Sequence, residues 1–245
     1  MPIVATDIKI YETKSTATGD GEAGGDGLGK YRSSDEITSG VSENVFDNVS
    51  AAESEAGDTE YRAIMIKNTH ATLSFINAKV WLAPASCTPM SDLTTQLANG
   101  GTETTVDVTD ASAFPTTGAF FVEDEEITYT GKSGNQFTGC TRGANGTSKT
   151  LHTVGTYVEH NQVRIYVEEP SNKTTGYIAS IADEGTEPAG SPTWNAVYSF
   201  ATGLSIGTLA AGEFYGVWIR RKIPVGCQAK TGISYALSRK GETEE

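Results

Sequence analysis

The feature that most constrains the fold of this chain is a stretch at residues 102–158, in which short alternating segments are separated by turn-forming residues. Polar and apolar side chains alternate at residues 105–108 and again at 126–130, the period of two expected for a β-strand with one buried face. Clusters of Gly, Asn, Pro and Ser separate these segments at short, regular spacing. The stretch therefore predicts a small, closed β-sheet unit, and it contains no recognisable catalytic centre.

The sequence on both sides of this unit also predicts β-strands. Residues 214–219 (FYGVWI) place apolar side chains on both faces of a strand, which predicts a strand buried on both sides or one packed between a sheet and a partner. Residues 68–71 are expected to form a tight turn between two antiparallel strands. The other candidate strands are residues 3–11, 61–66, 73–76, 78–83 and 160–168, with an edge strand within 174–183.

The candidate strands of the first and last thirds of the chain are expected to pair, which makes the central unit an insertion in a loop of one sandwich. We therefore predict an all-β protein, an antiparallel β-sandwich with a small inserted β module. The expected divisions are an N-terminal strand with an acidic, glycine-rich arm at residues 1–40, a split β-sandwich at 41–98 and 160–245, and an inserted small β domain at 99–159.

The charge of the chain argues against a nucleic-acid partner. The formal net charge is −13 and the isoelectric point is near 4.7, whereas a protein that neutralises phosphates needs a basic face. Residues 1–60 hold 13 acidic against 4 basic side chains and so carry −9 of this charge. The glycine-rich part of this segment predicts an arm that becomes ordered against a neighbour.

Hydropathy and cysteine spacing exclude other classes of protein. No apolar run approaches the ~18–20 residues that span a bilayer, and the N-terminus lacks the basic and apolar regions of a secretory signal. We therefore expect a soluble protein made in a cytoplasm, with no membrane partner. The three cysteines, Cys87, Cys140 and Cys227, have neither CxxC nor Cys/His metal spacing and are expected to be buried thiols, with an approach of Cys87 to Cys227 left open.

Four consecutive acidic residues, Glu123, Asp124, Glu125 and Glu126, are the densest group with the chemistry for Ca²⁺ binding or acid–base catalysis. Neighbouring side chains on a strand point to opposite faces, so these four are not expected to converge. One of them is expected to pair with Arg142. We predict no catalytic, metal-binding or cofactor-binding residues in the chain.

The remaining motifs also favour structural roles. The glycine-rich run at residues 19–30 lacks the GKS or GKT of a phosphate-binding loop and is acidic where phosphate would lie. The single histidines, expected at surfaces or turns, are His70, His152 and His160. The N-x-[ST] sequons are Asn48, Asn145 and Asn172, and Asn145 is expected to be a turn residue tolerant of positive φ. Most of the tryptophans, Trp81, Trp194 and Trp218, are expected to pack in cores, with a sugar-binding face as the alternative.

The sequence at residues 114–158 resembles a small β module found repeatedly in virion proteins of tailed bacteriophages. The positions that fit its pattern are Phe114, Pro115, Glu126, Ile127, Tyr129, Arg142, Gly143, Gly146, Thr147, His152, Gly155 and Val158. The flanking residues 42–83 and 207–229 are similar to an uncharacterised phage structural family, in which a β-sandwich is split by a variable insert. In the module we expect Glu126 to pair with Arg142, and Phe114, Tyr129 and Val158 to supply core.

The resemblance implies a non-enzymatic virion component, and it transfers no catalytic residue or cofactor. Expected partners are other virion proteins of the capsid, neck or tail and further copies of this chain, bound through the arm and the sheet edges. Head decoration, neck or collar, and tail or baseplate all remain open. The alternative is an adsorption module that binds a host surface or glycan. A third hypothesis, hydrolysis of a glycan, requires a carboxylate pair such as Asp124 and Glu126 in a cleft.

Overall fold

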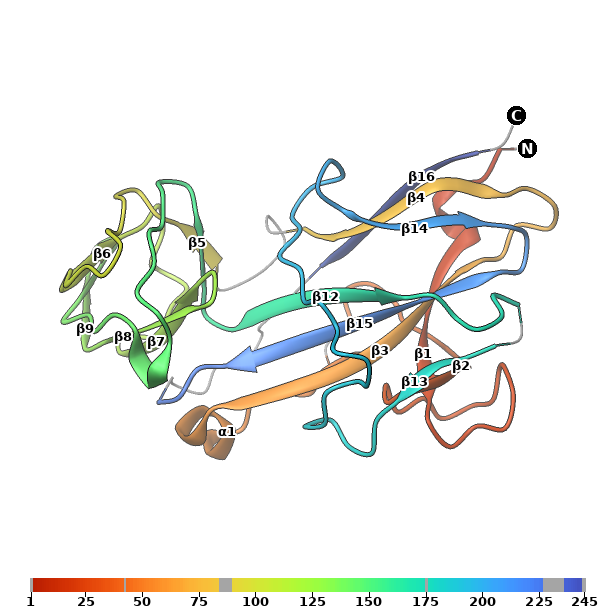
Figure 1. Cartoon of the computed structure of the whole chain (residues 1–245), viewed down its shortest axis with the longest axis horizontal. Coiled ribbons are helices and arrows are strands. Elements are labelled where there is room, and N and C mark those ends of the chain that lie inside the picture. Colours follow the sequence, from red (N-terminus) through yellow and green to blue (C-terminus); the bar gives the residue numbers. More distant parts are fainter. Residues whose placement is uncertain (1, 42, 84–89, 175, 227–235, 244–245) are drawn as a thin grey trace.

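The computed structural model describes residues 2–41, 43–83, 90–174, 176–226 and 236–243, and it is built almost entirely of antiparallel β-sheets. Figure 1 shows an elongated molecule with a β-sandwich at one end and a smaller β module at the other. The prediction of an all-β, sandwich-like fold is confirmed.

The sandwich consists of a six-stranded sheet packed on a three-stranded sheet. The larger sheet has the strand order β12 (Gln162–Glu168), β15 (Phe214–Ile223), β3 (Asp58–Asn68), β1 (Ile8–Lys14), β2 (Gly29–Glu36) and β13 (Ile178–Ser180). The smaller sheet has the order β14 (Leu204–Leu209), β4 (Phe75–Leu82) and β16 (Leu237–Thr243). A 3₁₀ helix (Ala5–Asp7) precedes β1, and the short helix α1 (Ala51–Ala56) precedes β3.

Strand β15 explains why the larger sheet is buried on both faces. One face of the strand contributes Val217 and Ile219 to the core between the two sheets. The other face contributes Phe214 and Trp218 to a second apolar cluster, which includes Ile178 of the edge strand β13. The prediction of a strand buried on both sides is confirmed, as is the prediction of an edge strand within residues 174–183.

Strands from the two ends of the chain pair directly, as predicted. Strand β3 pairs with β15 along its whole length, with Ala63 opposite Trp218, and β4 pairs with both β14 and β16. The predicted hairpin across residues 68–71 is wrong, because β3 and β4 lie in opposite sheets. The buried Asn68 side chain bridges this crossing by donating to the carbonyls of Leu73 (2.8 Å) and Leu209 (3.0 Å).

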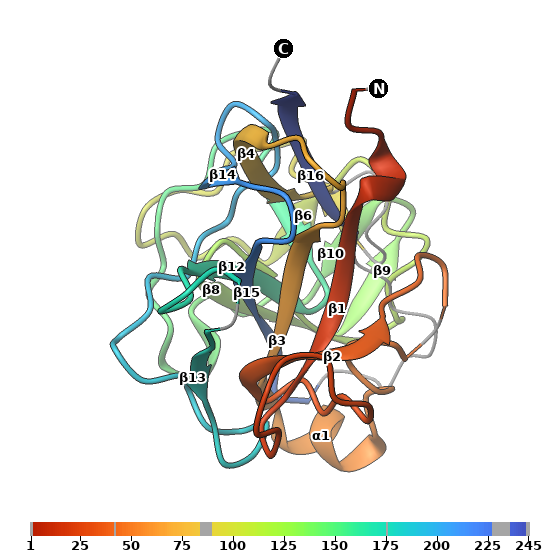
Figure 2. The same ribbon diagram turned by 90° about the vertical axis from the view of Figure 1, so that its right-hand side faces the viewer.

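The N-terminal segment differs from the predicted arm, because β1 and β2 form a hairpin inside the six-stranded sheet (Figure 2). The loop between them folds back on this hairpin through one carboxylate of its own and one of β2. Asp26 accepts from the backbone N–H of Ser15 and Leu28, and Asp35 accepts from the N–H of Gly24 and Gly25 at 2.7 Å. The acidic residues of this segment therefore supply hydrogen-bond acceptors, and its glycines supply backbone N–H donors that can approach them closely. Together they hold one ordered loop.

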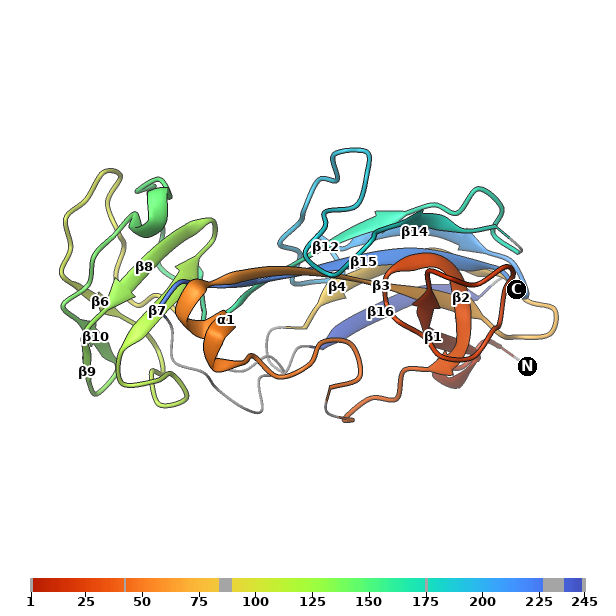
Figure 3. The ribbon, with the colours of Figure 1, turned by 90° about the horizontal axis from the view of Figure 1, so that it is seen from below.

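The module is built from two small sheets that enclose a separate core. One sheet has the order β5 (Met90–Asp92), β11 (Tyr157–Glu159), β7 (Gly118–Val122) and β8 (Glu125–Tyr129), and the other has the order β6 (Thr105–Asp107), β10 (Gln136–Thr138) and β9 (Gly131–Ser133). All members of the core cluster lie between Leu93 and Val158, and they include Phe114 and Tyr129 as predicted. The module follows β4 and leads into β12, and α1 lies at the end of the sandwich that faces it (Figure 3).

Candidate functional site

The most extensive buried polar cluster of the module is centred on Arg142, whose side chain is fully buried. Its guanidinium donates to both carboxylate oxygens of Glu125, at 2.9 and 2.6 Å, and to Glu103 at 2.9 Å. The carbonyls of Ala98 and Thr150 accept two further bonds, at 2.7 and 2.6 Å. A bidentate arginine with these additional acceptors is a satisfied buried charge, and it ties together four separate segments of the module.

His152 joins the same cluster, and the prediction that it lies at a surface or turn is wrong because its side chain is buried. Its ring nitrogens lie 2.8 Å from Glu123 and 2.8 Å from Glu125. Glu123 lies in the turn between β7 and β8 with a positive φ of 54°, where the alternation argument for strands does not apply. Two of the four consecutive acidic residues therefore converge on one histidine.

The electrostatics of this cluster favour a structural role. Burial alone would raise the pKa of Glu125, but the bonds from Arg142 and His152 outweigh it and hold that pKa below its ordinary value. Burial would lower the pKa of Arg142, and its bonds to Glu125 and Glu103 raise it instead. Both groups therefore stay charged and bonded to each other, so neither is poised to exchange a proton near neutral pH.

Glu126 does not pair with Arg142 as predicted, because it points to the opposite face of β8 from Glu125. Its carboxylate accepts from the Asn145 side chain at 2.6 Å and from the backbone N–H of Val225 at 3.2 Å. Burial raises its pKa above the ordinary value. Asp124, the other half of the pair considered for hydrolysis, instead accepts from Gln162 at 3.1 Å.

A second buried ion pair lies where the module joins the sandwich. Arg164 of β12 donates to Glu159 of β11 at 2.8 and 3.1 Å, and the Tyr198 hydroxyl bonds to Glu159 at 3.2 Å. The backbone carbonyl of Glu123 accepts from Arg164 (3.0 Å) and from Gln162 (2.6 Å), which connects the β7–β8 turn to the sandwich. These bonds restrain the module at its point of attachment.

The other residues considered from the sequence have ordinary structural environments. His160 is buried, so the prediction of a surface position is wrong for this histidine too. The ring of His70 accepts from the backbone N–H of Thr72 and Leu73. Asn145 has a φ of 51°, which confirms the prediction of a turn residue. Trp218 is fully buried, while Trp81 and Trp194 are half-buried against the two cores of the sandwich.

Only one of the three cysteines lies within the described residues. Cys140 is a buried free thiol, as predicted, and burial raises its pKa to about 12. It therefore remains protonated at neutral pH and is a poor nucleophile. Cys87 and Cys227, and with them the open question of their approach, lie outside the described residues.

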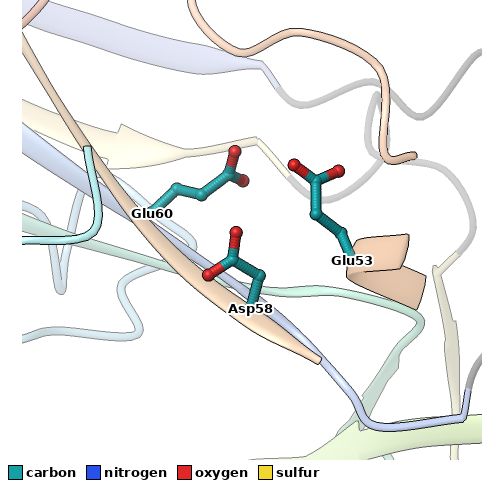
Figure 4. A group of neighbouring side chains, drawn as sticks. All are labelled: Glu53, Asp58 and Glu60. Atoms are coloured by element: carbon teal, nitrogen blue, oxygen red, sulfur yellow. The ribbon is translucent and has the colours of Figure 1, made fainter. Parts of the chain in front are cut away.

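A group of three carboxylates lies where α1 meets the start of β3. The side chains of Glu53, Asp58 and Glu60 point toward one another, and one oxygen from each lies within 4.8 Å of the other two (Figure 4). Glu60 is fully buried, and Glu53 and Asp58 are half-buried. Burial raises the pKa of Glu60 despite its ion pair with Arg221, and the charges of Asp47 and Glu53 raise it further.

The sequence predicted no site at this group, although a signal was present. Residues that alternate along β3 share one face, and Ile64 and Ile66 of that face belong to the core between the sheets. Glu60 lies on the same face two residues before Arg62. A glutamate on the core face of a long strand requires a partner, and Arg221, directly opposite it on β15, provides one.

An apolar groove of about 930 Å³ runs beside the edge of β16, between that strand and the N-terminal hairpin. Its lining includes Ile8, Ile10, Ile37, Val45, Phe46 and Leu237. Among the described residues β16 pairs with β4 alone, so its other edge faces this groove. Arg239 and Ile8 both line the groove, and the Arg239 guanidinium donates to the carbonyl of Ile8.

Comparisons with known proteins give no further assignment. In the described part of the chain, no helix has the length and apolar character needed to cross a membrane. No protein-family model, no curated protein and no solved structure matches this chain.

Proposed function

We propose that this protein is a non-enzymatic structural component of a tailed-phage virion, which binds neighbouring subunits through its sheet edges. The observation that carries this proposal is the edge of β16 that no described strand pairs with, which lies beside an apolar groove. Backbone N–H and C=O groups on a strand edge pair with an extended segment of a neighbour, and an adjacent groove accepts its side chains. The resemblance of residues 114–158 to a module of phage virion proteins supports the choice of assembly.

The hydrogen bonding of β16 defines which groups are available for such pairing. Ala83 donates its N–H to the carbonyl of Ala236, and bonded pairs alternate along an antiparallel ladder. Leu237 and Arg239 therefore direct their backbone N–H and C=O groups away from β4. The side chains of both residues also line the groove. A neighbouring strand at this edge would gain backbone bonds and apolar contacts together.

The glycine-rich loop at residues 15–28 has a smaller part in this proposal than the sequence suggested. Its carboxylates are bonded to its own backbone and to Arg32, with Asp20 at 2.9 Å. It offers an acidic surface to a basic neighbour, while backbone pairing falls to the edges. Copies of this chain and other capsid, neck or tail proteins are the proposed partners.

The first experiment locates the protein in the particle. Purified particles are examined by electron microscopy after labelling with an antibody against this chain, and the expected result is label at one position, head, neck or tail. Particles that contain no copy of the chain contradict the proposal. Light scattering of the isolated protein then gives its oligomeric state in solution.

The second experiment tests the edge of β16. Arg239→Pro removes an edge N–H, while Arg239→Ala loses the same side-chain bonds to Ile8 and keeps the N–H. We expect Arg239→Pro to reduce incorporation into particles well below that of Arg239→Ala, with both variants folded by circular dichroism. Equal incorporation of the two variants would exclude this edge.

The alternative, binding to a host surface or glycan, has one observation in its favour. Phe200 is 38% exposed and lies 5.8 Å from the ring of Trp81, with the amino groups of Lys79 and Lys240 at 5.3 and 5.2 Å from its centroid. Aromatic rings beside cations can hold a sugar carrying an acidic group. Binding of purified protein to host cells or glycans, lost in Phe200→Ala, would support this alternative over assembly.

A further inference from the structure

We infer that Glu53, Asp58 and Glu60 form a binding site for one calcium ion, an inference that does not rest on the proposed role in assembly. The three carboxylates come from two elements, α1 and β3, and converge on one point (Figure 4). Calcium prefers oxygen ligands, tolerates irregular geometry and often takes water as additional ligands. Magnesium requires a nearly ideal octahedron and zinc prefers nitrogen and sulfur, so this group of carboxylates favours calcium.

The first argument is that each carboxylate uses one oxygen within the protein and leaves the other without a partner among the described residues. Glu53 accepts from the Ser50 N–H at 2.6 Å through Oε2, and Asp58 accepts from the Thr59 N–H at 2.7 Å through Oδ1. Glu60 accepts from Arg221 through Oε2. Three oxygens, one from each residue, therefore remain available to a ligand.

The second argument comes from the buried oxygen of Glu60. Its Oε1 is shielded from solvent and has no hydrogen-bond partner in the part of the chain that the structure describes. A charged oxygen in that state is costly, because it has lost its hydration and gained nothing in return. Figure 4 shows this carboxylate directed at Glu53 and Asp58, two further negative groups that increase the cost. A cation at the point of convergence removes both penalties.

The charge balance around the group leaves room for a divalent ion. Arg221 is the basic side chain that bonds to it, and its guanidinium also contacts Asp47 through the backbone carbonyl at 2.8 Å and the carboxylate at 3.4 Å. With Asp47, the group has four carboxylates and one guanidinium, which bonds to two of them, so negative charges exceed positive ones by three. A single Ca²⁺ reduces that excess to one, whereas Arg221 alone leaves it uncompensated.

The position of the site suggests what the ion would do. It would join the first turn of α1 to the start of β3, at the end of the sandwich next to the module. The intervening Gly57 packs closely against Val225, whose N–H bonds to Glu126 of the module. Calcium bound here would therefore restrain the same junction that Glu126 spans.

The test measures calcium binding to the whole protein by isothermal titration and by Tb³⁺ luminescence, after removal of divalent ions with a chelator. We expect one site per chain and a higher midpoint of thermal unfolding with calcium than with chelator. Glu53→Gln keeps the helix cap, because glutamine serves equally well at this position, and Asp58→Asn keeps the acceptor for Thr59. Each variant should weaken calcium binding by at least the ~10–100-fold that loss of a supporting partner costs at other metal sites.

The matched control is Glu55→Gln, which removes the same charge from an exposed position of the same helix. It should bind calcium as the unmodified protein does. No binding at millimolar calcium, or binding that Glu53→Gln and Asp58→Asn leave unchanged, would overturn the inference. If Glu55→Gln weakened calcium binding equally, the binding would be a general attraction of calcium to the acidic surface, and the inference of a specific site would also be wrong.

Discussion

The inserted module and the sandwich each bury a glutamate against an arginine, and the two pairs are completed differently. In the module, Glu125 uses both oxygens, with Arg142 across both and His152 and the N–H groups of Gly143 and Thr150 beside them. In the sandwich, Glu60 bonds to Arg221 through one oxygen, and the other oxygen has no partner within the described ranges. The pKa values follow this difference, since that of Glu125 is lowered and that of Glu60 is raised.

The comparison shows that the presence of a buried ion pair does not by itself indicate a binding site. What indicates one is a polar atom of the pair that is left without a hydrogen bond. A fully bonded pair fixes the surrounding segments and needs nothing else. An incompletely bonded pair lowers stability unless a proton, water or ion completes it. The buried ion pair of the module therefore has a structural role that needs no further ligand. The buried carboxylate oxygen that still lacks a partner among the described residues lies in the sandwich.

The largest expected effect is the loss of the module's ion pair. Arg142→Met leaves the buried charge of Glu125 without its arginine, which should lower the free energy of unfolding by about 3–5 kcal/mol. Urea denaturation measures the change. The control is Lys9→Met, which breaks a surface pair with Glu36 that is largely exposed to water, and its loss should be much smaller. Similar losses in the two variants would show that the Arg142 cluster is not the support described above.

A smaller effect is expected where the sandwich depends on backbone geometry. Gly29 has a φ of 86°, and a Cβ atom there would lie 2.1 Å from the carbonyl of Ala179 in β13. Gly29→Ala should therefore combine the strain of positive φ, about 1–2 kcal/mol, with displacement of the edge strand. Gly40 has a similar φ of 81° with open space around it, so Gly40→Ala measures the strain alone. A Gly29→Ala protein as stable as Gly40→Ala would contradict close packing of β13.

The two glutamates should also respond to pH in opposite directions. Because the pKa of Glu60 is raised, the folded protein binds more protons than the unfolded protein just above the ordinary glutamate pKa. Glu60 should therefore contribute increasing stability as the pH falls through its raised pKa toward the ordinary glutamate value in calcium-free buffer, by about 1.4 kcal/mol for each unit of the shift. Glu125, with its lowered pKa, contributes stability that is lost at lower pH, below the ordinary glutamate value.

Glu60→Gln isolates the first of these contributions. The stability of the unmodified protein minus that of the variant, from urea denaturation, should rise as the pH is lowered, because every other titrating group is common to both. A difference that is independent of pH would show that Glu60 is not held ionised at a cost. Calcium bound at the site should make this difference in stability less dependent on pH.

The sequence could predict the features that depend on local alternation. The two apolar faces of residues 214–219 identified β15 as doubly buried, because a strand's faces follow from a period of two. It could not predict which partner each face meets. Glu126 was matched with Arg142, yet one step along the strand places Glu125 there instead.

The sequence could not predict contacts between residues that are far apart in the chain. It also could not predict how the polar, glycine-rich segment folds. His152 meets Glu125 from 27 residues away, so a search for local motifs leaves it isolated. The glycine-rich loop was expected to order on a neighbour, and instead Asp26 and Asp35 bond to its own N–H groups. The alternation along β3 could point to Glu60 alone, whereas its convergence with Glu53 depends on where α1 lies beside β3, which sequence patterns do not define.

The smallest expected effect distinguishes the two adjacent glutamates of β8. Glu126→Gln should change the free energy of unfolding at pH 7 by no more than about 1 kcal/mol, because the amide oxygen can accept the same bonds from Asn145 and Val225 and the variant no longer buries a charge. The raised pKa of Glu126 has the same cause, burial that penalises the charged form. Glu125→Gln is the matched control, and it should cost several times more because Arg142 loses its charged bidentate partner. Equal losses for the two variants in urea denaturation would mean that the module's stability depends on the number of carboxylates on β8 rather than on the face to which each one points.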